Sequence, residues 1–157
     1  MTVIRPAPVR KSIVVKASTE KSFTTFTSRI GRWWPRSKSI GSAPQADVVL
    51  EPGVGGRWYE RGSDGSECQW GKVLQWEPPG RLVLAWQIGA DWKFNPALVT
   101  EVEITFTALA AGETRVDIEH RYLERLGDNA ARAREAFDSE KGWNGVLQAF
   151  GELAVAG

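Results

Sequence analysis

The hydrophobic positions at the start of the chain predict a short strand followed by a helix. Residues 12–16 are rich in β-branched side chains, which is typical of a strand. Apolar residues then recur at spacings of three and four, which is one face of an α-helix. They are Phe23, Phe26, Ile30 and Trp33. We expect Ser18 to cap this helix and Pro35 to end it.

Between residues 47 and 122 the apolar positions mostly alternate with polar ones, which predicts an antiparallel sheet. The expected strands are residues 47–50, 55–61, 67–76, 81–88, 99–108 and 114–122. In the last two, apolar and charged side chains alternate cleanly, so one face of the sheet should meet the core and the other should meet water. His120 and Tyr122 share the inward parity of Val116 and Ile118.

The C-terminal part of the chain predicts helices. Residues 128–137 are rich in Ala, Arg and Glu, and Ser139 is placed to cap a further amphipathic run. Its apolar positions are Trp143, Val146, Leu147, Phe150, Leu153 and Ala154. Gly142 and Gly145, near its start, either allow close packing or kink the helix.

Together these elements predict an α+β fold. Only the final helix is long enough to cover the apolar face of the sheet. We therefore expect a curved antiparallel sheet of about six to seven strands wrapped around a long C-terminal helix, with a short helical segment after the first strand. A length of 157 residues suits one domain, which we place at residues 11–157 behind a flexible N-terminus of residues 1–10.

Composition narrows the class of protein. Twenty Lys and Arg against nineteen Asp and Glu give a net charge of +1, which argues against a nucleic-acid partner. No apolar run is long enough to span a membrane, and residues 1–10 lack the apolar core of a secretory signal. One cysteine, Cys68, and one histidine, His120, exclude an internal disulfide and a Cys/His zinc site. We expect a cytoplasmic protein with no metal and no cofactor.

The tryptophan content stands out from this ordinary composition. Each of the eight indoles can bury roughly 150–250 Å², so together they either fill a core or line a cavity. Several of them lie near loops, which favours a cavity, and Trp92 and Phe94 fall on a loop suited to a lid. The candidate ligand-binding residues are Trp33, Trp34, Trp58, Glu60, Trp70, Trp86, Trp92, Phe94, His120, Trp143 and Leu147.

Two polar residues are candidates for acid–base chemistry. His120 is either a hydrogen-bonding or proton-transferring group in the cavity, or a satisfied histidine at the edge of the core. Glu60 shares the parity of Trp58 and faces the cavity if Trp58 does; alternatively Tyr59 is the inward residue, or a bulge at Gly55 and Gly56 shifts the parity. A pairing of Cys68 with His120 would make a nucleophile, although no local feature indicates it.

Charge is unevenly spread along the chain. Residues 1–43 carry nine Lys or Arg and one Glu, a net of +8. This segment either attracts an acidic partner or an anionic ligand, or simply pairs with the acidic remainder of the chain.

The order of elements and several motifs resemble the START-like or SRPBCC superfamily, and most closely its AHSA1-type family, named for the activator of the Hsp90 ATPase. The resemblance covers nearly the whole chain after residue 10. The motifs that carry it are Pro52-Gly53-Val54-Gly55-Gly56-Arg57, Asp64-Gly65, Trp70-Gly71-Lys72-Val73, Pro78-Pro79, Arg81-Leu82, Glu119-His120-Arg121 and Gly142-Trp143.

This resemblance implies a helix-grip fold with a cavity between the sheet and the last helix, which in such families takes lipids, polyketides or other apolar molecules. Three hypotheses follow: a binding protein for a hydrophobic small molecule, an enzyme of cyclase or hydrolase type using His120 and Glu60, and an interaction module of the Hsp90 co-chaperone kind. The last is disfavoured because the Hsp90-activating relatives carry an additional domain. An exposed sheet edge is consistent with a homodimer.

Overall fold

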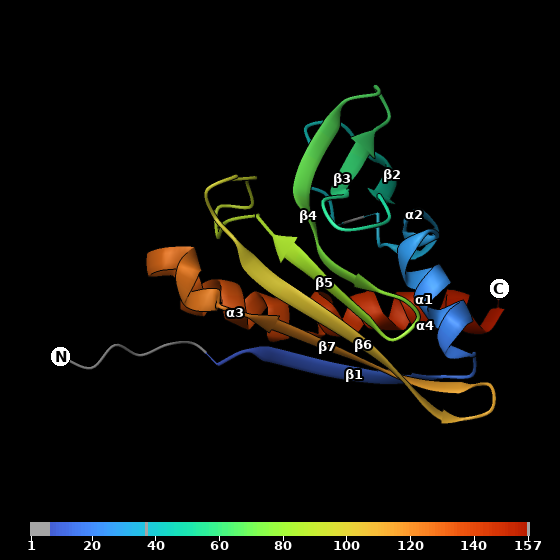
Figure 1. Cartoon of the computed structure of the whole chain (residues 1–157). Helices are drawn as coiled ribbons and strands as arrows, with labels where there is room; N and C mark the ends of the chain where they lie inside the picture. Colours follow the sequence, from blue (N-terminus) through green and yellow to red (C-terminus); the bar gives the residue numbers. More distant parts are fainter. Residues whose placement is uncertain (1–6, 37, 157) are drawn as a thin grey trace.

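The computed structural model describes residues 7–36 and 38–156, and its centre is a seven-stranded antiparallel sheet (Figure 1). The strands are β1 (Val9–Val15), β2 (Gln45–Leu50), β3 (Arg57–Gly62), β4 (Glu67–Glu77), β5 (Arg81–Trp86), β6 (Thr100–Ala110) and β7 (Glu113–Arg121). Their order across the sheet is β1-β7-β6-β5-β4-β3-β2, so the first strand lies at one edge of the sheet, beside the last strand. β1 begins two residues before the expected domain boundary, and residues 1–6 of the expected flexible segment lie outside the described residues.

The helices cover the inner face of the curled sheet. They are α1 (Thr19–Thr27), α2 (Ile30–Trp33), α3 (Ala130–Asp138) and α4 (Gly145–Ala156), with a 3-10 segment η1 (Leu123–Asn129) and a single π turn η2 (Glu140–Asn144). α4 lies along the sheet and contacts β1 and α1 (Figure 1). A curved sheet wrapped on a C-terminal helix is the architecture that the sequence predicts. In the described part of the chain, no helix has the length and apolar character needed to cross a membrane.

The first helical region differs from the single helix predicted. Ser18 caps α1 as expected, because its Oγ accepts a hydrogen bond from the Lys21 amide at 3.1 Å. The helix then stops at Thr27, and a separate short turn, α2, carries Trp33. Hydroxyls near the break bond back to the preceding turn: Thr27 Oγ1 donates to the Phe23 carbonyl at 2.7 Å. Such bonds compete with the helical ladder, which agrees with a break at this point.

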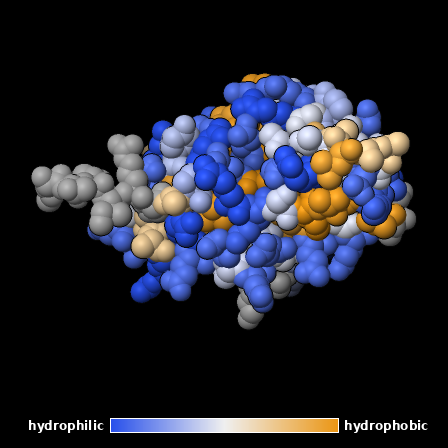
Figure 2. Space-filling model, turned by 90° about the horizontal axis from the view of Figure 1, so that it is seen from below, coloured by the Kyte–Doolittle hydropathy of each residue, from blue (hydrophilic) through white to orange (hydrophobic). Residues whose placement is uncertain are grey.

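The two faces of the sheet differ as the alternation predicts. Val102 lies opposite His120 and Ile104 opposite Ile118 on the buried side of β6 and β7. On the other side Arg121 reaches Glu101 and Glu103, both at 2.9 Å, and forms part of a lattice of ion pairs. Figure 2 shows a largely hydrophilic surface in the view from below, with hydrophobic residues gathered toward the end at which the C-terminus lies.

Tyr122 does not take the inward position predicted for it. Its φ of 63° places it in the left-handed region, and its side chain is 41% exposed. The strand ends at Arg121 for this reason, and the side-chain alternation ends with it.

The C-terminal helical region is bent at Gly142, which is one of the two roles that the sequence suggests for this glycine. Gly142 has φ −86° and ψ −131°, so the backbone leaves the helical conformation between α3 and α4. Ser139 is not the side-chain cap that the sequence predicts, because its Oγ instead donates to the Ala136 carbonyl at 2.7 Å. The bend lets Phe137 and Trp143 belong to two helical segments that meet at an angle.

The bend predicts that Gly142→Ala destabilises the fold. A Cβ at this position would lie 2.3 Å from the Phe137 carbonyl oxygen and 2.4 Å from that of Ala136, both backbone atoms that cannot move aside. We expect a loss of about 1–3 kcal/mol in the free energy of unfolding, measured by urea denaturation. Gly80→Ala is the matched control, because a Cβ there meets nothing within 4 Å. Equal effects of the two changes would contradict a close approach at Gly142.

Candidate functional site

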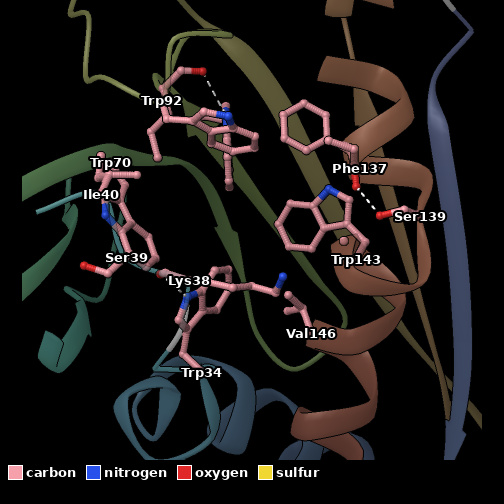
Figure 3. Close-up of a pocket in the computed structure, with 14 residues that line it drawn as sticks. Trp34, Lys38, Ser39, Ile40, Trp70, Trp92, Phe137, Ser139, Trp143 and Val146 are labelled. Atoms are coloured by element: carbon pink, nitrogen blue, oxygen red, sulfur yellow. Dashed lines mark hydrogen bonds between the residues drawn. The ribbon is translucent and has the colours of Figure 1, made fainter. Parts of the chain in front are cut away.

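A cavity of about 340 Å³ opens between the sheet, the bend before α4 and the loop that follows α2 (Figure 3). We call it the tryptophan pocket. The residues that line it are Trp34, Lys38, Ser39, Ile40, Trp70, Trp86, Ile88, Trp92, Ala136, Phe137, Ser139, Gly142, Trp143 and Val146. Figure 3 shows Trp70 and Ile40 on one side of the space, with Phe137 and Trp143 on the other.

The aromatic rings of the wall support one another. Trp34 lies 5.0 Å from Trp70 between ring centroids, and Trp86 lies 5.6 Å from Trp143. Trp58 packs behind them, 5.4 Å from Trp70 and 5.7 Å from Trp86. Three of these four pairs are edge-to-face, an arrangement that the ring quadrupole favours, and the pair of Trp34 and Trp70 is tilted. The wall is therefore a connected aromatic layer.

The four buried indoles that line the pocket all direct their N–H groups to acceptors in the protein. The Nε1 atoms donate from Trp34 to Lys38 O (3.3 Å), from Trp70 to Glu60 Oε1 (3.1 Å), from Trp86 to Ile88 O (3.0 Å) and from Trp143 to His120 Nδ1 (3.2 Å). Each bond satisfies a polar atom that would otherwise be buried without a partner. The polar atom of each indole is thus engaged, which leaves carbon surface for a ligand to contact.

A bulge in β4 brings Trp70 to Glu60. Trp58 pairs with Gly71 and Tyr59 pairs with Gln69, so Trp70 is the extra residue on its strand. On β3, Glu60 shares the inward side with Trp58, as one of the two alternatives predicts, since both side chains are buried on the inner face of the sheet. Tyr59 is buried too, beneath the Arg57 guanidinium 4.3 Å from its ring. The bulge lies on β4 rather than at Gly55 and Gly56.

Glu60 is a buried carboxylate that organises the loop at the pocket. Its Oε1 accepts from the Ile40 amide (2.7 Å), the Gly41 amide (3.2 Å) and the Trp70 indole; its Oε2 accepts from Ser39 Oγ (2.5 Å). Four donors compensate for the loss of water around the charge. Glu60 does not line the pocket; it holds Ser39, Ile40 and Trp70, which do.

His120 plays the same part on the opposite side of the pocket. Thr100 Oγ1 donates to the Trp86 carbonyl at 3.1 Å, so its oxygen accepts the proton of His120 Nε2 at 2.8 Å. Nδ1 then carries no proton and accepts from Trp143. Complete burial lowers the pKa of His120 from 6.5 to about 3, so the ring is neutral at physiological pH. This geometry is that of a satisfied core histidine.

The predicted site residues fall into two groups. Those that line the pocket are Trp34, Trp70, Trp86, Trp92 and Trp143; those that do not are Trp33, Trp58, Glu60, Phe94, His120 and Leu147. Trp92 stands at the rim, 46% exposed and 5.9 Å from the Phe137 ring. Phe94, two residues further along the same loop, instead forms an isolated antiparallel backbone bridge with Ile88.

The structure does not bring the proposed reactive pairs together. Glu60 lies on β3 and His120 on β7, with β4, β5 and β6 between these two strands in the sheet. Cys68 lies opposite Glu60 in the sheet, and burial together with that carboxylate raises the pKa of its thiol, which disfavours the reactive thiolate.

Sequence reasoning missed the residues that come from loops and from the helix bend. They are Lys38, Ser39, Ile40, Ile88, Ala136, Phe137, Ser139, Gly142 and Val146. No hydrophobic periodicity marks residues 38–40, because a loop has none. Phe137 is signalled only by its place at the end of a predicted helix, and it lines the pocket from the last turn of α3.

The chain is similar to known proteins over almost its whole length. Residues 16–154 match the family described as Activator of Hsp90 ATPase homolog 1-like protein. An anthrahydroquino-Gama-pyrone synthase, Txn09, complexed with SUM, shares 40% identity over 94% of this chain and 97% of that chain, with a TM-score of 0.67. CalC from Micromonospora echinospora, a self-sacrificing resistance protein, shares 33% identity over 94% of each chain, with a TM-score of 0.69.

More distant similarity supports the helix-grip architecture alone. The Aha1 dimer from Colwellia psychrerythraea shares 17% identity over 95% of this chain and 96% of that chain, with a TM-score of 0.62. None of the curated proteins matches the chain.

The four bonds to Glu60 predict that Glu60→Gln loosens one wall of the pocket. The amide is uncharged and cannot accept hydrogen bonds at its nitrogen, so the contacts to Ser39 and the loop amides weaken. We expect a loss of about 1–3 kcal/mol in unfolding free energy and faster hydrogen exchange at the amides of Ile40 and Gly41. Glu67→Gln, on the exposed side of the neighbouring strand, should change neither quantity. Unchanged exchange at both amides in Glu60→Gln would show that the carboxylate does not hold the loop.

The depressed pKa of His120 predicts a specific dependence of stability on pH. The unfolded chain takes up a proton at this residue below about pH 6.5, whereas the folded protein does so only near pH 3. The contribution of neutral His120 to the free energy of unfolding is therefore fully present above pH 6.5. It falls by up to about 1.4 kcal/mol per pH unit as the pH drops toward 3. Urea unfolding of the native protein and of His120→Gln between pH 7.5 and 4.5 separates this contribution from the carboxylates, since Gln does not titrate. Parallel profiles for the two proteins would refute it.

Proposed function

We propose that this chain, which belongs to the Activator of Hsp90 ATPase homolog 1-like family, binds a flat, largely apolar aromatic small molecule of the polyketide kind in the tryptophan pocket. The observation that carries the proposal is the wall itself: four buried indoles with their N–H groups engaged in the protein, joined by Phe137, around a cavity of about 340 Å³. Ligand sites of this kind span about 300–1,000 Å³. The volume therefore suits a small ligand.

The shape of the wall favours a planar guest. Trp70 on one side and Phe137 and Trp143 on the other leave a space bounded by aromatic surfaces (Figure 3). A fused ring system placed there gains apolar burial together with edge or offset stacking, worth about 0.5–1.5 kcal/mol for each aromatic pair beyond the area term. A flexible chain would gain the burial but lose more conformational freedom on binding.

The similar proteins point to the same class of ligand. The relative with 40% identity is called an anthrahydroquino-Gama-pyrone synthase, and that name denotes a fused-ring product. The identity of 40% extends over nearly the full length of both chains, which supports a related ligand class for this chain. The structure offers no comparable support for acid–base catalysis by His120 and Glu60, since neither lines the pocket.

Fluorescence and calorimetry test the proposal. Anthraquinone should quench and shift the tryptophan emission in a saturable way, because several indoles line the cavity, whereas a saturated fatty acid of similar mass should bind more weakly. The absorbance of the dye complicates quenching, so isothermal titration calorimetry supplies the affinity.

Two substitutions on one helix locate the site. Ala136→Phe adds a ring inside the pocket, and Ala131→Phe adds the same ring on the exposed side of α3. We expect Ala136→Phe to weaken anthraquinone binding at least tenfold, and Ala131→Phe to leave it unchanged. Saturable binding that is insensitive to Ala136→Phe would place the ligand elsewhere, and no binding of any fused aromatic probe would overturn the proposal.

A further inference from the structure

The polar groups of the tryptophan pocket are unevenly divided between donors and acceptors. Ser39 Oγ donates its proton to Glu60 Oε2 at 2.5 Å, and Ser139 Oγ donates to the Ala136 carbonyl at 2.7 Å. Each hydroxyl therefore has only lone pairs left for a ligand. The four buried indoles have no N–H left to give, as shown above. The lining thus offers acceptors readily but very few donors.

Two side-chain donors of the lining lie outside this count: the indole N–H of Trp92 at the rim and the ammonium of Lys38. Among the described residues that line the pocket Lys38 is the one with a charged side chain, and none of them is acidic. Figure 3 shows its side chain running from the loop across the cavity, toward the side that carries Val146.

The backbone of Lys38 is well anchored. Its N–H donates to the Pro35 carbonyl at 3.0 Å, and its own carbonyl accepts from Trp34 Nε1 and from Gln45 Nε2, the latter at 2.9 Å. The next residues of the loop are held by Glu60, as described above. The ammonium is therefore presented from a fixed support rather than from a loose surface loop.

We propose that the ligand carries an acidic oxygen, such as a carboxylate or an ionised phenol, and that Lys38 Nζ binds this oxygen while the ring system lies among the indoles. This inference rests on the proposed function and specifies the ligand class further. An ammonium attracts an anionic oxygen more strongly inside an apolar cavity than in water, because the effective dielectric constant is lower there. Hydrogen bonds between charged partners are also the strong ones.

The same arrangement sets the direction of the ligand. With its acidic oxygen at Lys38, hydroxyl groups elsewhere on the ring system would meet Ser39 or Ser139, whose oxygens can only accept. A ligand that presented a cationic group instead would be repelled by the like charge of the ammonium, and none of the described lining residues is acidic to offset that repulsion.

A pair of probes that differ in one group tests the inference. Anthraquinone-2-carboxylate and its methyl ester have the same ring system, and only the first carries the anionic oxygen. We expect the acid to bind the native protein about ten- to a hundredfold more tightly than the ester in calorimetry at pH 7.5. In Lys38→Gln this difference should disappear while the ester binds as before, and Lys38→Arg should restore most of it.

Lys93→Gln is the matched control, because it removes an exposed positive charge from the loop of Trp92 without touching the lining. It should keep the full preference for the acid, and thermal denaturation checks that every variant is folded. Equal binding of acid and ester to the native protein, or a preference that survives in Lys38→Gln, would overturn the role of Lys38 while leaving the aromatic pocket intact. Failure of both probes to bind would overturn the proposed function and this inference together.

Discussion

The pocket depends on one constraint: a buried indole N–H that finds no acceptor costs free energy. Four tryptophans satisfy this constraint by turning their nitrogen atoms into the protein, toward Glu60, His120 and the carbonyls of Lys38 and Ile88. A buried donor without a partner costs about 1–3 kcal/mol, so each ring is tied to one orientation. The cavity is the space that remains when all four rings are oriented so that their N–H groups reach these acceptors. Trp58, behind the wall, shows the contrast, because its Nε1 has no partner among the described residues.

Glu60 and His120, the two candidates for acid–base chemistry, hold wall residues in place by hydrogen bonds. The carboxylate of Glu60 accepts hydrogen bonds from the loop of residues 39–41 and from Trp70, and both ring nitrogens of His120 are engaged, with Thr100 and Trp143. A general acid or base must exchange a proton with a substrate, which neither group does without releasing a wall residue. Burial that removes them from catalysis is the same burial that makes them effective anchors.

The sequence predicts the scaffold better than the site, and the reason is physical. Alternation along β6 and β7 reports which side of a strand is buried, so the inward position of His120 follows from parity alone. A bulge breaks parity at a single residue, and nothing in the composition of β4 marks Trp70 as the residue that carries it. Loops and bends have no period either, so Lys38, Phe137 and Ser139 become neighbours only once the chain has folded.

The hydrogen bonds also explain how an aromatic cavity stays open. Apolar walls gain free energy by closing on each other, and a cavity of this size would be filled if its rings were free to rotate. Rotation of Trp70 or Trp143 into the space would leave Glu60 or His120 short of a partner and bury an indole N–H against carbon. Two such losses, at about 1–3 kcal/mol each, are a substantial part of the 5–15 kcal/mol that holds a typical domain together. A ligand that fills the space makes the missing apolar contacts while every ring keeps its orientation. The walls that resist collapse are therefore also preorganised for binding.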